Sequence, residues 1–122
     1  MNTPAHLEQI IINALKDVKA RDIEVIDTSQ LSSQFERIIV ACGDSGRQTR
    51  ALAHNVLDRV HEAGCKVLGI EGEENGEWVL VDLGDIVVHV MQPAIRAYYR
   101  LEELWSARPA RHAATGASIL ET

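Results

Sequence analysis

The most informative segment of this 122-residue chain is residues 78–91, whose sequence is WVLVDLGDIVVHVM. Two apolar runs rich in Val and Ile are separated there by a turn that contains glycine, which is the pattern of a β-hairpin. We predict strands at residues 78–83 and 85–91, with Leu83 and Gly84 at the turn. The chain therefore contains at least one pair of antiparallel strands.

Alternation of side chains along the two strands divides the hairpin into two faces of different character. With the turn at Leu83 and Gly84, Trp78 lies opposite His89, and opposite residues share a face. One face is aliphatic and belongs to the core: Val79, Val81, Leu83, Ile86, Val88 and Val90. The other face is mixed: Trp78, Leu80, Asp82, Asp85, Val87, His89 and Met91.

The mixed face has two interpretations. An aromatic anchor beside apolar area, with charges toward one end, is the composition of a protein–protein interface. Alternatively, helices cover this face, so that Trp78 belongs to the core and His89 is a buried histidine with its hydrogen bonds satisfied. The pattern of residues leaves both interpretations open.

The segments on either side of the hairpin predict helices and further strands. Thr3 followed by Pro4 marks a helix start, because Thr caps free N–H groups and Pro has none to lose. Ser45 with Gln48 matches a capping box at the start of another helix. In chain order we expect a helix from residue 4 to near Arg21, strands at 23–28 and 37–41, a helix from 45 to 63, a strand at 66–70, the hairpin, and a helix from 92 to 105.

This order of elements predicts a single α/β domain over residues 1–105, with a mixed sheet of about five strands flanked by helices. Residues 106–122 show no sustained period, so we expect them to form a flexible tail.

The composition restricts the class of partner. Asp and Glu number 18 against 12 Lys and Arg, and the net charge of -6 opposes a phosphate backbone. Direct nucleic-acid binding is therefore disfavoured, whereas a basic protein partner is favoured. No apolar run approaches the roughly 20 residues that span a bilayer, and the first residues lack a signal-peptide pattern. We expect a cytoplasmic protein that does not contact membranes.

Three groups of residues have the composition of possible chemical sites. The Gly43 to Arg50 turn places backbone N–H groups at a helix start, where phosphate can bind, but it lacks the P-loop lysine and the Rossmann glycines. Asp82, Asp85 and His89 could supply metal ligands, although Asp is common beside tight turns. Cys42 and Cys65 match no zinc or catalytic motif, so we expect buried, reduced thiols. We predict no catalytic residue, cofactor or metal, with a nucleotide-binding enzyme as the alternative.

Residues 69–72, GIEG, together with residues 78–91 resemble the signature of the Iojap-like ribosomal silencing factors. Three further segments resemble the family in the same order: residues 22–28, 43–48 and 98–105. The likeness covers about residues 5–105. Cys42 departs from the pattern, because a Thr or similar residue is expected there.

The resemblance implies an α/β fold related to nucleotidyltransferases but without their catalytic carboxylates, and therefore no enzyme activity. It also implies association with the large ribosomal subunit through that subunit's fourteenth protein. Such binding would block joining of the small subunit and repress translation when nutrients are limiting, and free family members are often homodimers. The family's exposed sheet surface corresponds to Glu71, Trp78, Leu80, Asp82, Val87, His89 and Met91.

Overall fold

A computed structural model describes residues 3–30 and 36–99 of the chain. The elements in chain order are α1 (Pro4–Asp17), β1 (Arg21–Asp27), β2 (Arg37–Cys42), α2 (Gly46–Glu62), β3 (Gly69–Glu71), β4 (Trp78–Asp82), β5 (Ile86–Met91) and α3 (Pro93–Tyr99). The continuation of the last helix to residue 105 and the tail expected over 106–122 lie outside the described residues.

The strands form one five-stranded sheet in the order β1-β2-β5-β4-β3. Strands β2 and β5 are parallel, and the other neighbouring strands are antiparallel. The predicted α/β fold with a mixed sheet is confirmed. The relation to nucleotidyltransferases that the resemblance implies stays a prediction.

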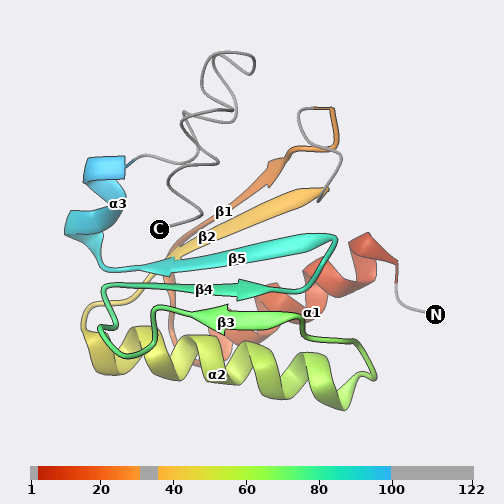
Figure 1. Ribbon diagram of the computed structural model, residues 1–122, viewed down its shortest axis with the longest axis horizontal. Helices are drawn as coiled ribbons and strands as arrows, with labels where there is room; N and C mark the ends of the chain where they lie inside the picture. The colour runs from red at the N-terminus through yellow and green to blue at the C-terminus, as the bar shows by residue number, and fades with distance from the viewer. Residues whose placement is uncertain (1–2, 31–35, 100–122) are drawn as a thin grey trace.

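Helices α1 and α2 lie over one face of the sheet, and α3 lies beside the end of β5 (Figure 1). The apolar stripes of α1 and α2 meet the aliphatic face of the hairpin, as the alternation predicted, and this is the main core. It includes Leu7, Ile11, Leu15, Leu52, Val56, Val60, Val79, Val81, Leu83, Ile86, Val88 and Val90. No helix in the described ranges is long and apolar enough to cross a membrane.

Both long helices begin at their predicted caps, and each ends with a residue in the left-handed conformation. The Thr3 side chain accepts the His6 N–H, and the Ser45 side chain accepts the Gln48 N–H. Helix α1 ends at Asp17, short of the expected Arg21, because Lys19 adopts a φ of 63° and reverses the chain. The end of α2 was predicted correctly, and Gly64 with a φ of 79° fills the equivalent position there.

The hairpin register differs from the predicted one. Trp78 lies opposite Met91, not His89, because the turn is centred on Gly84 and Asp85. The Leu83 N–H donates to the Ile86 carbonyl at 3.0 Å, closing this turn. Gly84 has a φ of 88°, which glycine adopts readily at the first central position of a tight hairpin turn. The pairing shifts by two residues, so both faces keep their predicted members.

The strand before residues 72–77, which we call the acidic loop, also differs from the prediction. We expected it at residues 66–70, whereas β3 spans Gly69–Glu71. After the left-handed turn at Gly64, the chain must cross from the end of α2 to the edge of the sheet before it can pair. Pairing begins where the Leu68 N–H donates to the Asp82 carbonyl at 2.8 Å.

Candidate protein-docking surface

The second face of the sheet, opposite α1 and α2, carries a smaller apolar cluster. Its buried members are Ile38, Val40, Val87 and Met91, and its partly buried members are Ile26, Trp78, Leu80 and Ile95. Only Ile95 comes from a helix, the short α3 at the end of the sheet. Among the described residues, this face therefore has less helical cover than the first.

One accessible part of the second face is a strip along β3 and β4, which we call the docking strip. Glu71 is exposed, and Trp78, Leu80 and Asp82 are half-buried. Glu71 lies directly opposite Leu80 across the two strands. Two apolar side chains are thus bordered by two carboxylates, an arrangement suited to a partner that presents basic groups around an apolar contact.

The three predicted site residues on β5 do not share this exposure. His89 and Met91 are 0% exposed, and Val87 is 6% exposed. Their expected place on an exposed surface is wrong, because side chains that include Trp78, Leu80 and Ile95 pack against this part of the second face. Of the seven predicted contact residues, the structure brings Glu71, Trp78, Leu80 and Asp82 together as accessible groups and places the other three beneath or beside them.

Trp78 and His89 are diagonal neighbours on the second face and are joined by a hydrogen bond. The indole Nε1–H of Trp78 donates to Nδ1 of His89 at 2.9 Å. The two ring centroids are 5.8 Å apart and the ring planes are tilted by 49°. Because Nδ1 accepts, a neutral imidazole must carry its proton on Nε2.

His89 is buried but only half satisfied, so the second interpretation of the mixed face is right about its burial alone. No described residue is placed to form a hydrogen bond with Nε2. An unpaired buried donor costs about 1–3 kcal/mol of stability. Burial also lowers the pKa of His89 from 6.5 to about 3, so that the ring is neutral at physiological pH.

The acidic loop before Trp78 is held against the start of α2. The Gly76 carbonyl accepts hydrogen bonds from the Thr49 hydroxyl and from the Gln92 side-chain amide. One turn further along α2, His54 Nε2 lies 2.8 Å from the Glu73 carboxylate. The loop that leads into the docking strip is therefore attached to both α2 and the start of α3. The sequence analysis did not predict this attachment. The glycines at positions 72 and 76 indicated a turn there but not its contacts with α2.

The Gly43 to Arg50 turn, predicted as the alternative phosphate site, is occupied by structural contacts. The Ser45 side chain accepts the Gln48 N–H, and Gln48 Oε1 accepts the Asp44 N–H at 2.7 Å. Gly76 packs so closely that an added Cβ would lie 2.8 Å from the Gly46 Cα. The Asp44 carboxylate lies 2.7 Å from Arg21 and adds negative charge beside the turn. This geometry opposes phosphate binding.

Two of the three possible metal ligands, Asp82 and His89, form hydrogen bonds within the hairpin. Asp82 accepts the Gly84 N–H at 2.9 Å, and His89 accepts from Trp78. Within residues 3–30 and 36–99, no three His, Cys, Asp or Glu side chains are grouped to hold a metal ion. Cys42 and Cys65 are both free thiols, but only Cys42 is buried, which corrects the prediction for Cys65.

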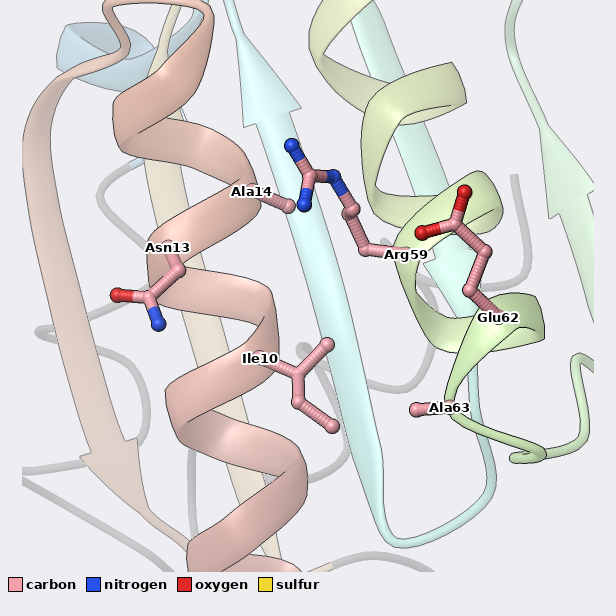
Figure 2. A pocket seen from close by; sticks show the side chains of 6 residues that line it. All are labelled: Ile10, Asn13, Ala14, Arg59, Glu62 and Ala63. Carbon is pink, nitrogen blue, oxygen red and sulfur yellow. The ribbon is translucent and has the colours of Figure 1, made fainter.

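A pocket of about 300 Å³ lies between α1 and α2, on the opposite side of the sheet from the docking strip. Figure 2 shows Ile10 pointing toward α2, whereas the Asn13 amide points away from the gap. The Arg59 guanidinium on its rim lies 2.8 Å from Asp17. The polar groups of the pocket do not converge on one point, so it is a weaker candidate for a functional site than the docking strip.

The chain is similar in sequence to proteins that act on ribosomes. A family model described as "Ribosomal silencing factor during starvation" matches residues 2–120. The ribosomal silencing factor RsfS of Chromobacterium violaceum is 54% identical over 102 residues, which cover 84% of each chain. A mouse protein named for mitochondrial assembly of the large ribosomal subunit is 30% identical over 102 residues, which cover 45% of its length.

The fold is also similar to solved structures. A crystal structure of a Chromobacterium violaceum protein superposes with a TM-score of 0.84 at 52% identity, covering 87% of this chain and 88% of that one. A Bacillus halodurans crystal structure gives a TM-score of 0.76 at 38% identity, covering 83% of this chain and 94% of that one. The resemblance predicted from residues 69–72 and 78–91 is thereby confirmed.

Proposed function

Because the chain belongs to the RsfS family of ribosomal silencing factors, we propose that it binds the large ribosomal subunit through that subunit's fourteenth protein. Bound there, it blocks joining of the small subunit and so represses translation in the cytoplasm when nutrients are limiting. The family description, which refers to starvation, supports the nutrient condition. The name of the mouse relative supports a partner on the large subunit.

The observation that carries this proposal is the docking strip itself. Trp78 and Leu80 supply accessible apolar area on a face that has little helical cover from residues 3–30 and 36–99, and Glu71 and Asp82 border it with negative charge. The net charge of -6 strengthens attraction to a basic protein that is embedded in RNA. Specific complexes commonly bury about 800 Å² on each partner, so the strip would form the centre of a larger contact.

The mechanism is steric and needs no reacting group on this chain. Trp78 is the proposed anchor, because buried aromatic side chains dominate the energetics of many interfaces. Leu80 extends the apolar contact, and Glu71 and Asp82 orient the basic partner. Val87 and Met91 support these residues from within the sheet. The bulk of the domain, including α1 and α2 on the far side, then occupies the space that the small subunit needs.

The docking strip also offers a surface for a homodimer of the free protein. In that arrangement, two copies would cover each other's Trp78, and the large subunit would compete with the second copy. We expect the dimer to dissociate when large subunits are added, and analytical ultracentrifugation measures this dissociation. A dimer that binds the large subunit intact would show that the two contacts use different surfaces.

The test of the proposed function is sedimentation of the purified protein with isolated large subunits, isolated small subunits and assembled ribosomes. We expect selective sedimentation with large subunits, together with inhibition when small subunits are added afterwards. The absence of binding to large subunits at both low and moderate salt would contradict the proposal.

A matched pair of variants tests the docking strip within that assay. Leu80→Ala and Val25→Ala each shorten an accessible apolar side chain on a strand, and Val25 is 40% exposed on β1 at the other edge of the sheet. We expect Leu80→Ala to weaken sedimentation with large subunits and Val25→Ala to leave it unchanged. Equal effects of the two changes would remove the strip from the contact.

A further inference from the structure

His89 occupies a fully buried position with apolar neighbours, which a hydrocarbon side chain would suit. Its neighbours across the sheet are Val40 on β2 and Leu80 on β4, and it is 0% exposed. Within the described residues, Nε2 has no hydrogen-bond partner. An imidazole at this position therefore carries a penalty that Leu would avoid, and the only described polar contact that offsets it is the bond from Trp78.

That bond holds the anchor of the docking strip from beneath. Trp78 is half-buried, so its ring is partly open to a partner, while its Nε1–H is directed inward to Nδ1 of His89 at 2.9 Å. A ring fixed by a directional bond loses less conformational freedom on binding than a ring that samples several rotamers. The contact at the surface thus depends on an acceptor placed beneath it.

We propose that His89 is a positioning residue, whose Nδ1 holds the Trp78 indole in the orientation that the basic partner binds, while His89 itself touches no partner. This inference rests on the proposed docking function and reassigns His89 from a contact residue to a support. The hydrocarbon surroundings keep the ring uncharged, so Nδ1 remains a hydrogen-bond acceptor instead of becoming a second donor facing the indole.

The two ring nitrogens can be tested separately by substitution. Asn places its amide group near the position of Nδ1, whereas Gln places it near the position of Nε2, and Leu removes both. His89→Asn therefore keeps an acceptor for the indole, and His89→Gln does not. His89→Leu also removes the unpaired buried N–H, so it should fold at least as stably as the unsubstituted chain.

The experiment measures the affinity of each variant for isolated large ribosomal subunits and the hydrogen exchange of the Trp78 indole N–H by NMR. The chain has two Trp residues, so Trp78→Phe assigns the resonance. We expect His89→Leu and His89→Gln to bind roughly tenfold more weakly, as expected for one net hydrogen bond, with faster indole exchange. His89→Asn should restore both values to within about threefold of the unsubstituted chain.

Each other outcome overturns the inference in a different way. Full affinity in a folded His89→Leu variant would show that the orientation of Trp78 does not matter for binding. Rescue by Gln but not by Asn would identify Nε2 as a direct contact. If the unsubstituted chain does not bind large subunits, the proposed function fails and this inference fails with it. If the unsubstituted chain binds and His89→Leu binds equally well, only this inference fails and the docking function stands.

Discussion

Glu71 lies directly opposite Leu80 across the β3–β4 pair, so a carboxylate and an apolar side chain are direct neighbours on the docking strip. Cross-strand neighbours of this kind are close enough to meet the same partner group. An incoming Lys or Arg could place its hydrocarbon stem on Leu80 and its charge beside Glu71. In the proposed complex, the strip would therefore combine charge attraction over a distance with apolar contact at close range.

Reversing the charge of Glu71 should slow association with the large subunit. Glu71→Lys is compared with Asp58→Lys, which makes the same charge change on the exposed surface of α2. We expect Glu71→Lys to lower the association rate severalfold at low salt and to weaken its salt dependence, because rim charges act mainly on the encounter. Stopped-flow association at several salt concentrations measures both. Equal slowing by Asp58→Lys would indicate that only the total charge matters.

Removing the Trp78 ring should cost more than any other change in the strip. Trp78→Ala is expected to weaken binding to large subunits by about 2 kcal/mol or more, as for a buried aromatic anchor. Affinity by calorimetry and folding by circular dichroism are measured on the same samples. A folded Trp78→Ala variant with unchanged affinity would exclude Trp78 as the anchor.

The buried imidazole makes stability depend on pH. The pKa of His89 is lowered to about 3 in the folded chain, below its ordinary value of 6.5, so the unfolded chain binds the proton more readily. The resulting stabilisation is present above pH 6.5 and is lost as the pH falls toward 3, by at most about 1.4 kcal/mol per pH unit. Urea unfolding at pH 7, 6 and 5 should show this loss in the unsubstituted chain and a smaller loss in His89→Leu. Parallel slopes for the two proteins would contradict it.

Two glycines with the same backbone angle should differ in their tolerance of a side chain. Gly64 and Gly76 have φ values of 79° and 78°, but a Cβ at Gly64 meets nothing within 4 Å, whereas one at Gly76 would lie 2.8 Å from the Gly46 Cα. Gly64→Ala should cost about 1–2 kcal/mol from backbone strain alone. Gly76→Ala should cost clearly more, as measured by chemical unfolding, because the loop must also move away from α2. Equal losses would mean that this contact adjusts without penalty.

The faces of the hairpin could be predicted from the sequence even though its register could not. Side chains alternate with a period of two, so a pairing shifted by two residues leaves every residue on its predicted face. The register itself depended on which residue of the turn takes a positive φ, and Gly84 took it at the first central position. The end of α1 was mispredicted for a related reason. Lys19 adopts a positive φ, which is uncommon for lysine and is not indicated by the sequence.

The burial of His89 could not be predicted from its own strand. Burial depends on which side chains pack around His89, and the parallel pairing with β2 places Val40, which is distant in the chain, beside it. The attachment of Gly76 to Thr49 and Gln92 is likewise a contact between distant segments. The local pattern placed Trp78, Leu80 and Asp82 on one face, and the family resemblance added Glu71. Which members of that face are accessible depends on the tertiary arrangement.

The single parallel pairing of β2 with β5 also has a consequence for how the molecule assembles. Strands β1 and β2 pair with each other, and β3, β4 and β5 form a second unit of sequential neighbours, so each unit can form by short-range closure. Joining the two units requires the long connection through α2 to close first, which is the slower kind of step in folding. We therefore expect the environment of His89 to be completed late in folding, so that the docking strip acquires a fixed indole only after the two halves have met.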